Sequence, residues 1–126
     1  MMPCSMSDIQ ELRRLEIEEC IRNPDYFCEK YGHIEDRTKE NIVQPFDLWP
    51  AQRQTIKEFK TYKQNIVLKA RQLGISWLVI HYACTVMLRP GRVVVGLSRS
   101  ETEAMELVRR LAFICDNALG LIYGKK

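Results

Sequence analysis

The sequence has little of the material from which disulfide frameworks and zinc sites are built. Its 126 residues contain five cysteines and two histidines. The cysteines form no CxxC pair, and none of them lies beside a histidine. An odd number of cysteines without ligand spacing is typical of a reducing compartment, where cysteine serves as a small apolar residue. We therefore expect no disulfide framework and no zinc site.

Long apolar stretches are also missing. Residues 1–14 have no apolar core of the kind that a signal peptide needs. The most apolar run, residues 75–88, holds His81, Tyr82 and Thr85 and is too short and too polar to span a bilayer. These absences predict a soluble, cytoplasmic protein without a membrane partner.

Charge of one sign is not concentrated anywhere along the chain. The 19 basic and 16 acidic residues give a formal charge of +3, spread evenly. This balance is compatible with nucleic acid as a partner but does not argue for it, because nucleic-acid-binding domains usually carry a clustered basic face. The hydrophobic fraction of 46% is high enough for a packed core.

The N-terminal third is predicted to be helical. Ser7 and Gln10 have the spacing of a capping box, so a helix should begin there and end near Arg22. Arg14 and Arg22 each lie four residues from Glu18, the spacing of surface ion pairs. Asn23-Pro24 should stop this helix.

Three further segments lead up to the middle of the chain. Residues 25–31 should form a short helical turn with Gly32 as its C-cap. Residues 33–48 are expected to be a mostly extended connection. Trp49-Pro50 should then open another helix, in which Ile56, Phe59 and Tyr62 recur at helical spacing.

The pattern changes after residue 64. Residues 65–68 (Asn-Ile-Val-Leu) predict a short strand, residues 69–74 a loop, and residues 76–88 a buried helix that is apolar on nearly every face. The turn at residues 89–91 leads to residues 93–97, which have the continuous apolar character of a central parallel strand.

Ser100 and Glu103 form a capping box for a last helix. Its inner side should hold Ala104, Leu107, Val108, Leu111, Ile114 and Cys115. The predicted fold class is therefore α/β, with a parallel β-α-β-α unit behind a helical N-terminal lead-in. A parallel sheet usually has more than two strands, so this unit looks unfinished.

The loop between the first predicted strand and its helix has the makings of a phosphate site. Backbone N–H groups at the start of a helix, together with the helix dipole, attract anions. The usual P-loop pattern is G-x-x-x-x-G-K-[ST]. Here Gly74 and Ser76 are in place, but Lys69 replaces the first glycine and Ile75 replaces the lysine. An ordinary solvated loop is the alternative interpretation of this charged cluster.

Residues 67–78, V-L-K-A-R-Q-L-G-I-S-W-L, resemble the deviant Walker A loop of phage large terminase subunits. The resemblance implies that Lys69 binds phosphate, that Arg71 acts catalytically near the γ-phosphate, and that Ser76 holds Mg²⁺. A flexible lysine can reach the same phosphates from the front of a tight loop. The remaining residues of the nucleotide-binding loop would be Ala70, Gln72, Leu73, Gly74 and Ile75.

Other stretches resemble the same family. Residues 46–53 (F-D-L-W-P-A-Q-R) are similar to its adenine-recognition motif, which would make Gln52 the residue that reads adenine, since an amide both donates and accepts. Without the resemblance, Gln52 would be an ordinary residue on a helix surface. Residues 93–104 and the lead-in around residues 23–31 also look like this family.

The resemblance implies a partial RecA-like P-loop ATPase of a phage or prophage terminase. Residues 1–45 would be the helical lead-in and residues 46–126 the N-terminal half of the ATPase domain. In the family, the intact subunit uses ATP and Mg²⁺ to drive double-stranded DNA into the capsid, with a small terminase subunit and the portal protein as partners, in the cytoplasm of a bacterial host. The exposed strands should also favour self-association.

No apolar run ending in Asp-Glu follows the loop, and no nuclease domain is present, so we expect weak nucleotide binding and no useful hydrolysis by this chain alone. Two other interpretations stay open. One is a truncated, non-catalytic prophage remnant that is an interaction module or inert. The other is a helicase-like P-loop ATPase fragment, although helicase loops normally keep lysine beside Ser/Thr. Ser76 could also be simply the helix N-cap.

Overall fold

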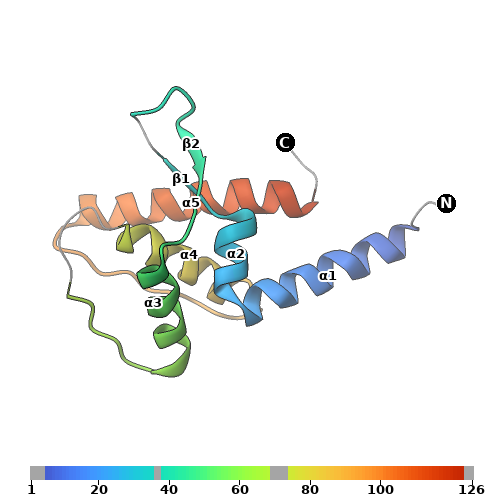
Figure 1. Ribbon diagram of the computed structural model, residues 1–126, viewed down its shortest axis with the longest axis horizontal. Coiled ribbons are helices and arrows are strands. Elements are labelled where there is room, and N and C mark those ends of the chain that lie inside the picture. Colours follow the sequence, from blue (N-terminus) through green and yellow to red (C-terminus); the bar gives the residue numbers. More distant parts are fainter. Residues whose placement is uncertain (1–4, 36–37, 69–73, 124–126) are drawn as a thin grey trace.

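A computed structural model describes residues 5–35, 38–68 and 74–123 of the protein. Most of the described chain is helical (Figure 1). The elements in chain order are α1 (Met6–Arg22), α2 (Pro24–Tyr31), β1 (His33–Glu35), β2 (Val43–Pro45), α3 (Pro50–Thr61), α4 (Ile75–Met87) and α5 (Glu101–Tyr123).

The predicted parallel β-α-β-α unit is wrong. Helices hold 65% of the described residues, and the sheet within them is a single antiparallel pair, β1 with β2. Residues 65–68 and 93–97, the two predicted strands, are extended but unpaired. Ile66 and Leu68 are 100% exposed, and Leu97 is 90% exposed. A RecA-like core is therefore not what this chain forms.

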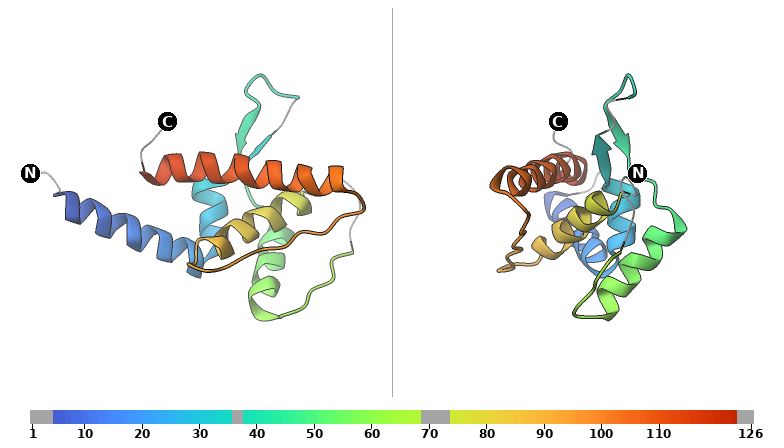
Figure 2. Two further views of the ribbon diagram at one scale, coloured as in Figure 1. Left: turned by 180° about the vertical axis from the view of Figure 1, so that it is seen from behind. Right: turned by 90° about the vertical axis from the view of Figure 1, so that its left-hand side faces the viewer.

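The physical reason is that a sequence with β propensity forms a strand only when it is paired with another strand. A β-type run of four or five residues has no hydrogen bonds of its own and needs a neighbouring backbone in register. The segment after α3 and the segment after α4 run as irregular chain past the helices (Figure 2). Neither meets a partner strand among the described residues, so β propensity alone does not make a sheet.

The first predicted helix is confirmed, but its cap is not. The N-cap is Ser5, whose side chain accepts from the Asp8 backbone N–H at 3.2 Å, in place of the predicted Ser7 with Gln10. Arg14 pairs with Glu18 at 2.5 Å, as predicted. Arg22 instead approaches Glu19, at 3.8 Å.

The remaining helices agree closely with prediction, and the connection at residues 33–48 does not. Gly32 is the C-cap of α2, and Pro50 is the first residue of α3. Residues 33–48, expected to be a plain extended connection, contain the β1–β2 hairpin, in which Ile34 pairs with Gln44. Gly74, with φ of 71°, is the N-cap of α4, so Ser76 is not the cap.

Helix α4 lies in the middle of the molecule, between α5 and α3 (Figures 1 and 2). Its apolar character on most faces explains this place, because it packs against partners on several sides. One core cluster joins α1, α2, α4 and α5 and contains Cys20, Phe27, Tyr31, Ile80, Cys84, Ile114 and Ala118. A second joins α2, α3 and α4 and contains Cys28, Phe46, Leu48, Ile56 and Leu78.

Candidate functional site

A pocket of about 340 Å³ lies where α3 and α4 begin, beside the β1–β2 hairpin. We call it the Gln52 pocket. The residues that line it include Lys39, Asp47, Trp49, Gln52, Gly74 and Trp77. The pocket therefore joins the proposed adenine motif, residues 46–53, to the last glycine of the proposed phosphate loop.

Gln52 is held in place by the start of its own helix. Its side-chain oxygen accepts a hydrogen bond from the Trp49 backbone N–H at 2.9 Å, which completes part of a capping box. Gln52 is only 4% exposed. The interpretation of Gln52 as an ordinary surface glutamine is therefore wrong, because its amide is fixed at the wall of the pocket.

Gly74 lies directly against this amide. A Cβ built on Gly74 would stand 2.9 Å from the Gln52 side-chain nitrogen, closer than real side-chain contacts allow. The left-handed φ of 71° independently favours glycine at this position. The positive φ thus favours glycine for the turn into α4, and a side chain at this position would also displace the Gln52 amide.

The N-terminus of α4 opens toward the same place. Its first intrahelical hydrogen bond runs from the Leu78 N–H to the Gly74 carbonyl at 3.1 Å, and among the described residues no side chain caps this end. The N–H groups of residues 75–77 therefore have no acceptor within the helix. Uncapped N–H groups and the positive end of the helix dipole favour an anion at this end.

The other predicted loop residues divide into two groups. Lys69, Ala70, Arg71, Gln72 and Leu73 lie outside the described residues. Ile75 and Ser76 line a different cavity, an apolar one of about 430 Å³ between α4, α5 and residues 94–96. The structure thus brings Gln52 and Gly74 together, but it does not bring Ser76 into the Gln52 pocket.

Two aromatic side chains, Trp49 and Trp77, belong to the pocket wall. Trp49 is 56% exposed at its rim, and Trp77 is half-buried. Behind Trp77, the His81 Nδ1 lies 2.6 Å from the Trp77 carbonyl oxygen. The His81 and Phe46 rings pack with their centroids 4.6 Å apart. The first part of α4, around Trp77, is therefore held in place by contacts with the core.

His81 is fully buried, as predicted for a helix residue without a ligand partner. Its Nε2 has no hydrogen-bond partner among the residues that the structure describes, and burial lowers the pKa of this histidine to about 4. The imidazole is therefore neutral at physiological pH and contributes packing to the pocket floor.

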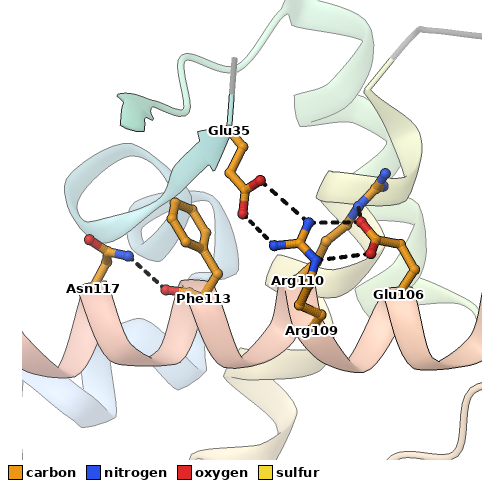
Figure 3. A network of polar contacts seen from close by, with 6 residues as sticks. All are labelled: Glu35, Glu106, Arg109, Arg110, Phe113 and Asn117. Carbon is orange, nitrogen blue, oxygen red and sulfur yellow. Dashed lines mark hydrogen bonds and ion pairs between the residues drawn. The ribbon is translucent and has the colours of Figure 1, made fainter. Parts of the chain in front are cut away.

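A charged network joins α5 to β1 (Figure 3). The Arg109 guanidinium bridges Glu35 of β1, at 2.7 Å, and Glu106, at 2.8 Å. Arg110 also contacts Glu106, at 3.2 Å, and its guanidinium lies 5.0 Å from the centre of the Trp77 ring. The network connects the hairpin and α4 to α5, which fixes two walls of the pocket. Long-range pairs of this kind are not visible from sequence spacing.

The part of the chain that the structure describes holds no group of three or more His, Cys, Asp or Glu side chains placed to bind a metal ion. Over the same residues, no helix is both long and apolar enough to cross a membrane. Cys20, Cys28, Cys84 and Cys115 are free thiols. Comparison of the chain with protein-family models, with curated proteins and with solved structures finds no match.

Proposed function

We propose that the chain is the adenine-nucleotide-binding segment of a terminase large subunit. The observation that carries this proposal is the contact between Gln52 and Gly74. It unites two residues that lie 22 positions apart in the sequence, each in a segment that resembles part of that family's nucleotide site. If the resemblance of residues 46–53 and of residues 67–78 to the family were due to chance, the two segments would not be expected to lie next to each other.

The chemistry of the Gln52 pocket supports the proposal. Trp49 and Trp77 offer aromatic surface for a base, and the uncapped N-terminus of α4 offers N–H groups for phosphate. Lys69 and Arg71 come directly before this helix in the sequence and would supply positive charge to the triphosphate. The proposed site is formed where α3 and α4 begin, so the proposal does not require a parallel sheet.

In this proposal ATP is the bound nucleotide, and Mg²⁺ accompanies its phosphates. The predicted ligand of that ion, Ser76, lines the neighbouring apolar cavity and is not assigned to it. Arg71 assists γ-phosphate transfer in the intact motor. The motor acts on double-stranded DNA with the small terminase subunit and the portal protein, in the cytoplasm of a bacterial host. Residues 46–126 hold the nucleotide, and residues 1–45 are the lead-in that packs against them.

The two tryptophans of the protein provide the assay, because both line the Gln52 pocket. Addition of ATP with Mg²⁺ should change the intrinsic fluorescence saturably. Lys69→Ala and Arg71→Ala should each raise the Kd by roughly tenfold or more, the effect of losing one charge-assisted hydrogen bond. Lys63→Ala and Arg99→Ala are matched controls on exposed positions and should bind as the wild type does. Equal affinity in all five proteins would refute the proposal.

Gln52→Glu separates the capping role of this residue from base recognition. Glutamate keeps an oxygen that can accept from the Trp49 N–H, but it loses the amide donor that adenine needs. We expect helix content to be retained and the preference for ATP over GTP to fall. Gln54→Glu, on the exposed face of the same helix, is the control. An unchanged ATP/GTP ratio in Gln52→Glu would exclude Gln52 as the adenine-recognising residue.

A second candidate function, a non-catalytic interaction module, is favoured by the exposed apolar segments. Ile66, Leu68 and Leu97 are 90 to 100% exposed, and such surface usually has a partner. In this case the protein self-associates. Light scattering should show a mass that rises with concentration, and Leu68→Asp with Leu97→Asp should return it to a monomer. A monodisperse wild-type monomer at all concentrations would exclude this candidate.

A further inference from the structure

A second pocket, of about 300 Å³, lies at the opposite ends of α3 and α4 from the Gln52 pocket. Four of its lining residues are basic, namely Arg22, Lys60, Arg89 and Arg92, and none is acidic. We call it the basic pocket. Its cations come from the end of α1, the last turn of α3 and the segment after α4. The fold thus gathers charges that are scattered in the sequence.

Two of these cations have ordinary roles at helix ends. The Lys60 ammonium donates to the main-chain carbonyl of Arg22 at 2.7 Å and so caps the C-terminus of α1. The Arg22 guanidinium lies 3.8 Å from the Glu19 carboxylate, and 70% of its side chain is exposed. Exposed pairs of this length neutralise little charge.

Arg89 and Arg92 have no such role. Both follow Met87, the last residue of α4. Across residues 5–35, 38–68 and 74–123, neither guanidinium takes part in a hydrogen bond or an ion pair. Arg89 donates its backbone N–H to the Val86 carbonyl at 3.2 Å. Unpaired guanidinium groups beside two further cations repel one another, and a bound anion would relieve this repulsion.

We propose that the basic pocket binds a small phosphorylated anion of the pyrophosphate class. Arg89 and Arg92 are its main ligands, because the planar guanidinium donates two parallel hydrogen bonds to phosphate oxygens. Lys60 adds a point charge. The volume is at the lower end of ligand pockets, which suits one or two phosphate groups.

The basic pocket is separate from the proposed nucleotide site. Gln52 and Lys60 are eight residues apart on α3, about 12 Å along the helix axis. The two ends of α4, Ile75 and Met87, are about 18 Å apart. A single nucleotide anchored at Gln52 with its phosphates at the N-terminus of α4 therefore cannot also fill the basic pocket. The two sites can be occupied and tested independently.

The test is a titration of the ¹⁵N-labelled protein with inorganic pyrophosphate in 0.15 M salt, followed by NMR. The amide signals of Arg22, Lys60, Arg89 and Arg92 should shift saturably. Arg89→Gln combined with Arg92→Gln should raise the Kd by roughly 100-fold, about tenfold for each lost charge-assisted contact. Lys63→Gln combined with Arg99→Gln removes the same net charge elsewhere and should change the Kd by less than about threefold.

Three results would overturn the proposal. Equal weakening in both double variants would mean diffuse charge attraction only, and an unchanged Kd in the Arg89/Arg92 variant would exclude these ligands. Lys69→Ala with Arg71→Ala distinguishes the two sites. It should abolish any shifts at residues 74–77 while leaving those at Arg89 and Arg92. Loss of the Arg89 and Arg92 shifts in that variant would show that no separate site exists, whatever the outcome for ATP.

Discussion

Glu16→Gln should destabilise the protein at neutral pH and make its stability less sensitive to acid. One oxygen of the Glu16 carboxylate accepts hydrogen bonds from the hydroxyls of Tyr26 and Tyr31, both at 2.6 Å, and from the Lys30 ammonium at 2.8 Å. Glu16 is on α1, and the three donors are on α2. This cluster therefore connects α1 to α2 through polar contacts.

The cluster lowers the pKa of Glu16 from 4.5 to about 2, chiefly through the Lys30 hydrogen bond and then through those of the two tyrosines. Because the folded protein holds the charged form more firmly than the unfolded chain does, the stabilisation is present above pH 4.5 and is lost as pH falls from 4.5 to 2. The difference corresponds to at most about 3 kcal/mol. Since the Glu16 side chain is 24% exposed, solvent screening reduces this to about 1–2 kcal/mol.

Urea unfolding at pH 7 and pH 3 measures the effect. The free energy of unfolding of the wild type should fall between these pH values by about 1 kcal/mol more than that of Glu16→Gln. Glu18→Gln is the control, because Glu18 is exposed and pairs with Arg14 on the same helix. If the free energy of unfolding of the wild type and of Glu16→Gln depends on pH in the same way, the Glu16 carboxylate does not stabilise the fold.

Two further predictions concern residues behind and beside the Gln52 pocket. The buried His81, with its pKa lowered to about 4, stays neutral in the folded state, so stability should fall as pH drops from 6.5 toward 4. Between pH 7 and 5, urea unfolding should show a loss about 2 kcal/mol larger in the wild type than in His81→Phe, and equal losses would contradict this. Gly74→Ala should lower the thermal midpoint more than Gly91→Ala. Both positions have positive φ, but only a Cβ at residue 74 meets Gln52, at 2.9 Å, and equal shifts would exclude that contact.

Gln52 has a capping role in α3 that would also suit the proposed nucleotide site. Its oxygen caps α3, and its buried amide is placed against the first residue before α4. The same hydrogen bond that begins the helix fixes the direction of the amide. A site built on such a cap is preorganised without any additional contact.

Local sequence rules were sufficient for most of the helices. Pro24, Pro50 and the Ser100–Glu103 pair mark helix starts that the structure places within a residue of prediction. These signals work because capping and proline geometry act within four residues. The same rules selected Ser7 in place of Ser5. Each serine has a residue three positions later that can complete a capping box, Gln10 for Ser7 and Asp8 for Ser5.

The strands were not predictable in this way. Residues 93–97 have the composition of a central strand, but composition says nothing about whether a neighbouring backbone is available. The hairpin at residues 33–45 was missed for the converse reason. Its strands are only three residues each and form because the chain folds back on itself, so Ile34 meets Gln44. Pairing is a property of two segments together.

By itself the sequence determined where most of the helices begin and that α4 would be buried. From resemblance alone it also predicted that residues 46–53 and 67–78 belong to a nucleotide site, and this stays a prediction. Only the tertiary structure decided that Gln52 meets Gly74, that Ser76 faces another cavity, and that four basic residues from three segments line one pocket. Capping and amphipathic spacing are local and can be read from neighbouring residues. Proximity between distant segments depends on how the helices pack, because that packing alone sets which surfaces meet.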